Sequence, residues 1–97
     1  MITRIVKMTF KPEEVANFLK IFSESKQYIR NVEGCSQLEL LNDISASAVF
    51  FTYSKWNTEK DLNNYRNSEL FESVWAKTKI LFAVKAEAWS LKSEIFS

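Results

Sequence analysis

Apolar and polar residues alternate over residues 1–10, and this two-residue period predicts a β-strand. From residue 15 onward the apolar side chains recur every three or four positions, which predicts an amphipathic helix with one apolar face: Val15, Phe18, Leu19, Phe22, Ile29 and Val32. Pro12 suits the first turn of this helix, and Gly34, the only glycine, suits the left-handed position that ends many helices. The chain therefore opens with a strand followed by a helix.

Two strands, a helical region and a last strand follow. The segments 35–41 and 46–56 are rich in residues that favour strands, and residues 42–45 between them are typical of a turn, so we expect a hairpin. Residues 57–61 carry capping side chains and acids that predict the start of a second helical region, and Ser68 with Glu69 provides a second cap within it. Residues 84–91 alternate again and predict the final strand.

The resulting order, β-α-β-β-α-β, is that of the ferredoxin-like α+β fold, in which two helices cover one face of a four-stranded antiparallel sheet. A length of 97 residues suits one domain, so we expect residues 1–97 to form a single unit. Because strands 1–10, 46–56 and 84–91 carry apolar or aromatic residues on both faces, a monomer would expose a large apolar patch. We therefore expect a homodimer that packs sheet against sheet.

Charge and cysteine content narrow the class of protein. The 13 basic and 12 acidic residues are spread along the chain, which argues against nucleic-acid binding because that needs concentrated positive potential. No apolar run approaches the roughly 20 residues that cross a bilayer, and no signal peptide opens the chain. Cys35 is the only cysteine, so no intrachain disulfide can form. We expect a cytoplasmic protein without a membrane segment.

The absence of histidine is the most restrictive feature of the composition. Imidazole is the commonest metal ligand and the commonest acid or base near neutral pH, so its absence excludes Ser-His-Asp triads, histidine-ligated haem and most zinc or iron sites. A single cysteine excludes thiolate metal clusters as well. We expect neither a metal nor a cofactor.

Three segments of the chain carry a family resemblance. Residues 32–35, Val-Glu-Gly-Cys, are similar to a Pro-Gly-Cys turn between a first helix and a second strand, with glutamate in place of proline. Residues 38–43, Leu-Glu-Leu-Leu-Asn-Asp, are similar to a second strand and its turn. Residues 56–71 match a strand-ending Trp, an acidic helix start, a Leu, a His and Ser-x-His-Phe, with Tyr65 and Leu70 at the histidine positions. Together these segments resemble the antibiotic biosynthesis monooxygenase family.

This resemblance implies a dimeric α/β barrel and an oxygenase chemistry without a cofactor, in which the deprotonated substrate itself reduces dioxygen. The haem-degrading branch of the same superfamily relies on an Asn in the first strand and on a Trp and a proximal His in the second helical region. Here the first strand has no Asn, and Tyr65 and Trp75 stand where that Trp and His would lie. The resemblance therefore implies no haem degradation of that type.

Aromatic side chains on the strand 46–56 are candidates for a ligand pocket. Trp56 ends this strand, and its indole either lines a pocket for a flat aromatic ligand or packs in the core. Phe51 and Tyr53 share one face of the strand, while Phe50 and Thr52 share the other. If the face with Phe51 and Tyr53 lines a cavity between two packed sheets, Tyr53 can donate a hydrogen bond to a phenol or quinone oxygen of a substrate. The other interpretation is that these two side chains only contribute to packing.

The second helical region and the first strand add further candidates. Tyr65 and Trp75 either point toward the mouth of the same cavity or pin the helix to the sheet. Asn64 and Arg66 lie nearby, either as polar anchors or as solvated surface residues. Arg4 lies on the apolar face of its strand, where a charged side chain needs a partner or water. It either holds an anionic intermediate or reaches solvent at the strand end.

We therefore expect an enzyme, a monooxygenase-like oxidoreductase that needs no cofactor and acts on a small aromatic or phenolic molecule. The candidate catalytic residues are Tyr53, Trp56, Tyr65 and Arg4. The candidate pocket residues are Phe51, Trp75 and Asn64. The alternative is a non-catalytic dimer of the same fold that binds a small ligand or serves in stress, and the replacement of the two family histidines favours it.

Overall fold

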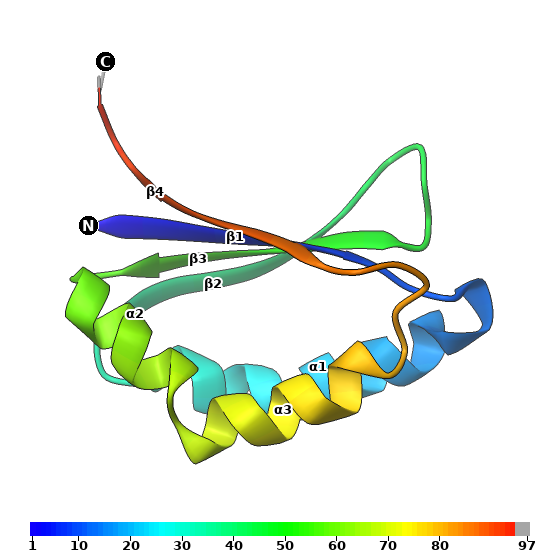
Figure 1. The fold of residues 1–97 in the computed structure, drawn as a ribbon, viewed down its shortest axis with the longest axis horizontal. Helices are drawn as coiled ribbons and strands as arrows, with labels where there is room; N and C mark the ends of the chain where they lie inside the picture. Colours follow the sequence, from blue (N-terminus) through cyan, green and yellow to red (C-terminus); the bar gives the residue numbers. More distant parts are fainter. Residues whose placement is uncertain (95–97) are drawn as a thin grey trace.

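Four strands form one antiparallel sheet in the computed structural model, which describes residues 1–94 (Figure 1). The strands are β1 (Ile2–Thr9), β2 (Cys35–Asn42), β3 (Val49–Trp56) and β4 (Glu87–Lys92), and their spatial order is β2-β3-β1-β4. This order and the chain connectivity confirm the predicted ferredoxin-like α+β fold.

The helices all lie on one face of the sheet (Figure 1). A short 3-10 turn, η1 (Pro12–Glu14), leads into α1 (Val15–Arg30), and the second helical region is divided into α2 (Glu59–Arg66) and α3 (Glu69–Lys79). The predicted cap at Ser68 causes this division: its hydroxyl accepts a hydrogen bond from Phe71 N at 3.2 Å and donates one to the Tyr65 carbonyl at 2.6 Å. The junction between α2 and α3 is therefore a defined bend.

Most strand ends lie within one residue of the predictions, but β3 and β4 each start three residues later than predicted. β3 begins at Val49 rather than at residue 46, because a turn closes there with a hydrogen bond from Val49 N to the Ala46 carbonyl at 3.0 Å. β4 begins at Glu87 rather than at residue 84, and Val84 is exposed, because the preceding segment first pairs with the end of β1 through Ala83 N and the Thr9 carbonyl.

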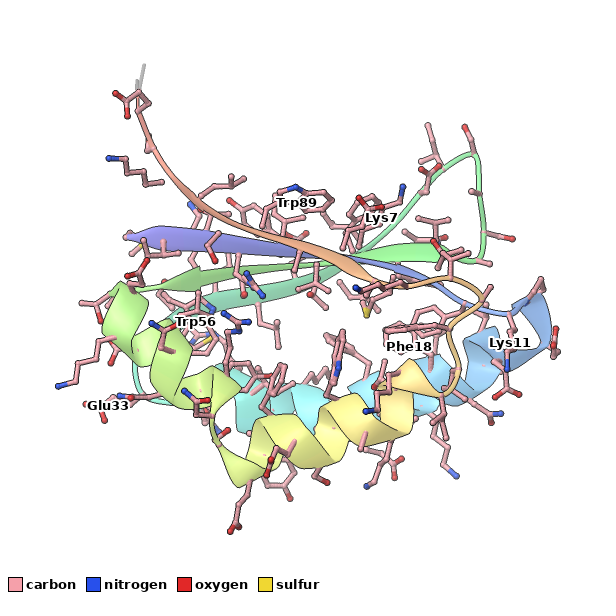
Figure 2. All side chains as sticks on the ribbon, in the orientation of Figure 1. Lys7, Lys11, Phe18, Glu33, Trp56 and Trp89 are labelled. Atoms are coloured by element: carbon pink, nitrogen blue, oxygen red, sulfur yellow. The ribbon has the colours of Figure 1, made fainter. Side chains whose placement is uncertain are left out.

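Buried side chains form two clusters between the sheet and the helices. One cluster contains Met8, Phe10, Phe18, Phe50 and Leu81, and the other contains Cys35, Trp56 and Leu62. Figure 2 shows Phe18 and Trp56 toward opposite ends of this layer. The layer is therefore packed at both ends, and the space between the ends is where a ligand site can form.

The sheet face opposite the helices carries apolar side chains among charged ones, and we call it the outer face. Figure 2 shows Lys7 and Trp89 on this side. Direct cross-strand pairing places Tyr53, Ile5 and Trp89 in one row across β3, β1 and β4. Trp89 and Leu91 are 41% and 47% exposed there. The β2–β3 turn and the end of β4 rise on the same side of the sheet (Figure 1).

Candidate functional site

A cavity of about 370 Å³ lies between the inner face of the sheet and the helices. Met8 and Phe18 bound it toward one buried cluster, and Trp56 and Leu62 bound it toward the other. All four strand segments and the helices α1, α2 and α3 contribute to its walls. Its polar or ionisable lining residues are Arg4, Thr52, Ser54, Tyr65, Arg66 and Thr78.

A polar row crosses the sheet on the cavity side. Arg4 on β1 pairs directly with Ser54 on β3 and with Ser90 on β4, so the three side chains project from the same face. Arg4 Nη1 donates a hydrogen bond to Ser90 Oγ at 2.9 Å. Trp56 Nε1 donates one to Ser54 Oγ at 3.0 Å. The partner that Arg4 requires on this apolar face is therefore a hydroxyl group rather than a carboxylate.

Positive charge is concentrated at the cavity. Arg66, at the end of α2, lines the same cavity as Arg4, and none of the acidic side chains within residues 1–94 does. Burial lowers the pKa of the Arg4 guanidinium, and the charge of Arg66 lowers it further. Because arginine stays protonated in proteins, the cavity presents two cations without a carboxylate.

A continuous run of aromatic rings forms the helix side of the cavity. Trp56 stacks on Tyr65 with ring centroids 5.0 Å apart, and Tyr65 meets Phe71 edge-on at 5.3 Å. Phe71 stacks on Trp75 at 5.8 Å with an angle of 11° between the rings. The bend at Ser68 makes this run possible because it brings the end of α2 against the start of α3. Flat rings aligned in this way offer a surface for a planar ligand.

Trp56 forms the back of this wall rather than its surface. Its side chain is 0% exposed and packs with Cys35 and Leu62, whereas Tyr65, Phe71 and Trp75 are only partly buried. A ligand in the cavity can therefore reach those three rings, while Trp56 supports Tyr65 from behind.

Tyr65 is the titratable group of this wall. Burial, with a smaller contribution from Cys35, raises the pKa of its phenol to about 12. Near neutral pH the phenol is neutral, so it can donate a hydrogen bond but cannot serve as a base. Within the described chain, the lining residues include no Asp, Glu, Lys, Cys or His that could accept a proton instead.

The structure brings together four of the seven candidate residues. Arg4, Trp56, Tyr65 and Trp75 all line the cavity between sheet and helices. Arg4 projects from the sheet, and Tyr65 and Trp75 project from α2 and α3 on the opposite wall. The Arg4 guanidinium on one wall of the cavity therefore faces aromatic rings on the other wall.

The other three candidates lie elsewhere. Phe51 and Tyr53 project from the outer face, because alternation along β3 places them opposite Ser54 and Trp56. Asn64 is exposed on α2 and does not line the cavity. The expectation that Tyr53 and Tyr65 share one cavity is therefore not met.

The hydroxyls of Ser54 and Ser90 lie on the cavity side of the sheet but were not among the candidates from the sequence. The two-residue period of the strands could have found both. Ser54 stands two residues before Trp56, and Ser90 stands two residues after Ala88, which lines the cavity. The two-residue period of a strand assigns each of them to the inner face.

Neither a metal cluster nor a membrane span is found in the described residues. No three Cys, Asp or Glu side chains within 1–94 gather closely enough to hold a metal ion. No helix in this range combines the length and the apolar character needed to cross a bilayer.

The element order and sheet topology define an α+β protein of the ferredoxin-like class with a cavity between its sheet and its helices. A model of the antibiotic biosynthesis monooxygenase family matches residues 1–77, and the chain belongs to this family. No curated protein shows significant sequence similarity to it.

Solved structures share the fold over nearly the whole chain. An antibiotic biosynthesis monooxygenase superposes with a TM-score of 0.91 at 17% identity, covering 98% of this chain and 100% of the other. A conserved protein from Methanosarcina mazei Go1 gives 0.91 at 18% identity, with coverages of 97% and 94%. Rv0793 from Mycobacterium tuberculosis gives 0.89 at 12% identity, with coverages of 99% and 97%. At these identities the likeness establishes the fold.

Proposed function

We propose that this protein is a monooxygenase that needs no cofactor and oxidises a small electron-rich phenol or hydroquinone in the cavity. One observation carries the proposal: the Arg4 guanidinium and the rings of Tyr65, Phe71 and Trp75 line the same cavity of about 370 Å³. The rings suit a planar aromatic body, and the guanidinium suits an oxygen anion on it. Membership of the monooxygenase family supports the reaction class.

In the proposed reaction the substrate supplies every electron that dioxygen accepts. For an anthrone, the two hydrogens of the ring CH₂ group are lost, one oxygen atom becomes the new carbonyl oxygen and the other leaves as water. The substrate must first become an anion, because the anion is the electron-rich form that reduces dioxygen. The contribution of the protein is to favour that anion and to exclude bulk water around it.

Arg4 is the group that favours the anion. A phenol in water has a pKa of about 10, and a neighbouring cation lowers the pKa of an acid by about 1–3 units. A phenol held against Arg4 would therefore be partly ionised near pH 8, with its proton released to solvent. Tyr65, neutral below its pKa of about 12, can donate a hydrogen bond to an oxygen of a substrate in the same cavity.

Oxygen uptake tests the proposal. Purified protein is mixed with a panel of anthrones and naphthohydroquinones in an oxygen electrode, and each rate is corrected for spontaneous oxidation. Arg4→Gln should lower kcat/KM by about 10²-fold, the usual effect of removing one donor to a reacting oxyanion. Lys77→Gln removes an exposed charge outside the cavity and should have no effect. Uptake no faster than the protein-free blank for the whole panel would refute the proposal.

A second function, ligand binding without catalysis, is favoured by one observation. The described lining residues offer no group that titrates near neutral pH, because the pKa of Tyr65 is raised and the other ionisable groups are arginines. A protein that binds panel members in a thermal-shift assay and leaves oxygen uptake at the blank rate would have this function.

The outer face is proposed to bind a second copy of the chain. It carries acids on its edge strands, Glu39 and Glu87, and lysines on its central strands, Lys7 and Lys55. This distribution allows two copies related by a two-fold axis to set the acids of one against the lysines of the other. The row of Tyr53, Ile5 and Trp89 would supply the apolar centre of that interface.

A further inference from the structure

The cavity holds more positive charge than a phenol alone would require. Arg4 and Arg66 both line it, and no carboxylate of the described residues does. Two like charges near one cavity repel each other, and this repulsion is one reason why the pKa of Arg4 is lowered. A phenol is neutral in water near pH 7 and becomes an anion only during the reaction, so it offers at most one transient negative charge.

A second groove adjoins the cavity and also carries cations. It shares Phe22 and Leu38 with the cavity and carries Lys26 and Arg30 on α1, again without an acidic residue in its described lining. Clustered charge of one sign around a cavity raises the local concentration of oppositely charged ligands and speeds their association. The approach on this side therefore favours a ligand that is already an anion in solution.

We propose that the natural ligand of the cavity is an aromatic carboxylic acid, whose carboxylate lies between Arg4 and Arg66 and whose ring packs against Tyr65, Phe71 and Trp75. A carboxylate is fully ionised near pH 7 and accepts paired hydrogen bonds from guanidinium groups. This inference rests on the proposed function and specifies the class of its substrate. The five N–H donors of the Arg4 guanidinium can serve both the carboxylate and a phenol oxygen of the same molecule.

Redox-inert ligands test the inference separately from catalysis. We would titrate the protein calorimetrically with 2-naphthoate and with 2-naphthamide, which have the same ring and nearly the same shape but differ in charge. The naphthoate should bind about 10- to 100-fold more tightly, the usual effect of hydrogen bonds to a charged group. Equal affinities, tighter binding of the amide, or no binding of the naphthoate would overturn the inference.

Variants identify the cations responsible. Arg66→Gln changes an exposed residue and should leave folding intact, yet reduce the preference for naphthoate by about tenfold or more. Arg4→Gln should reduce the preference in the same way. If Arg4→Gln folds poorly, Arg4→Lys takes its place as the test, and because it keeps the charge it should retain part of the preference. Lys77→Gln, a control of equal charge change outside the cavity, should retain all of it. A preference unchanged in Arg66→Gln would refute the placement of the carboxylate.

The two proposals fail differently. Selective naphthoate binding without oxygen uptake on the phenol panel would remove the proposed catalysis and leave the aromatic acid as the ligand. Oxygen uptake on neutral hydroquinones together with equal naphthoate and naphthamide affinities would support catalysis and overturn the carboxylate.

Discussion

Replacing Trp56 separates its structural contribution from a role in binding. Its side chain is 0% exposed, and its only side-chain hydrogen bond among the described residues runs from Nε1 to Ser54 Oγ at 3.0 Å. Truncation of a buried aromatic ring to alanine costs about 3–5 kcal/mol of unfolding free energy. In a domain of this size each kcal/mol shifts Tm by about 4–8 °C. We therefore expect Trp56→Ala to lower Tm by at least about 12 °C.

Trp56→Phe is the sharper variant because it keeps most of the ring contacts. It removes the Nε1 donor and leaves the buried Ser54 hydroxyl without its partner, which costs about 1–3 kcal/mol. Ser54→Ala leaves the indole N–H unpaired at a similar cost. The double variant removes both polar groups, so its loss should be smaller than the sum of the two single losses by about 1 kcal/mol.

Urea unfolding of the four proteins measures these free energies, and naphthalene-based ligands measure binding in the same samples. Because the Trp56 side chain is 0% exposed and Tyr65 stacks on it, affinity in folded Trp56→Phe should stay within about twofold of the unmodified protein. A Trp56→Phe variant of unchanged stability that binds more than about tenfold more weakly would refute the assignment of Trp56 to the back of the wall. Additive single losses would refute the Ser54 hydrogen bond.

Three further predictions follow from the outer face, the α1–β2 turn and Tyr65. Phe51→Lys would bury a charge in the proposed dimer interface at a cost of several kcal/mol, roughly, so sedimentation should show a dimer for the unmodified protein and a monomer for the variant; an unmodified monomer at micromolar concentration would contradict this. Gly34→Ala should destabilise the protein by about 1–3 kcal/mol in urea unfolding, because Gly34 has φ of +88° and an added Cβ would overlap the side chain of Asp61. The Tyr65 phenol should ionise near pH 12, as measured by the difference in phenolate absorbance from Tyr65→Phe. Because the folded-state pKa is above the unfolded value of about 10, the contribution of Tyr65 to stability is complete below pH 10 and is lost as the pH rises toward 12; ionisation of Tyr65 near pH 10 in the folded protein would contradict it.

Most of the fold could be predicted because each element has its own local signal. The helix of residues 15–30 shows in its three-to-four-residue period, and the separation of α2 from α3 shows in the capping side chain of Ser68. The starts of β3 and β4 could not be predicted in the same way. The start of β3 is set by the turn between Ala46 and Val49, and the start of β4 depends on pairing between segments far apart in the chain, such as the hydrogen bond from Ala83 N to the Thr9 carbonyl.

The site residues were harder to predict from the sequence, because apolar side chains lie on both faces of the sheet. On β3 the rings of Phe51 and Tyr53 lie on the outer face, while Phe50 and Trp56 share the inner face with the smaller Thr52 and Ser54. A ranking by hydrophobicity would place all four rings inside. It fails for Phe51 and Tyr53, because the smaller side chains on the inner face are the ones that leave room for a ligand. Arg4 was easier to assign, since a lone cation on an apolar face needs a particular environment.

The cavity itself follows from the sizes of the side chains on the inner face. Toward one end of the layer, the large side chains of Met8, Phe18 and Phe50 pack together, whereas toward the middle the sheet carries Thr52, Ser54, Ala86 and Ala88. A dry apolar void costs about 24 cal/mol per Å³, so a void of 370 Å³ would cost about 9 kcal/mol, close to the whole stability of a small domain. The polar lining residues Arg4, Thr52 and Ser54 reduce that cost because they let water occupy the space. In the proposed function, the release of that water from the facing rings of Phe71 and Trp75 favours an aromatic ligand over water in the rest of the cavity.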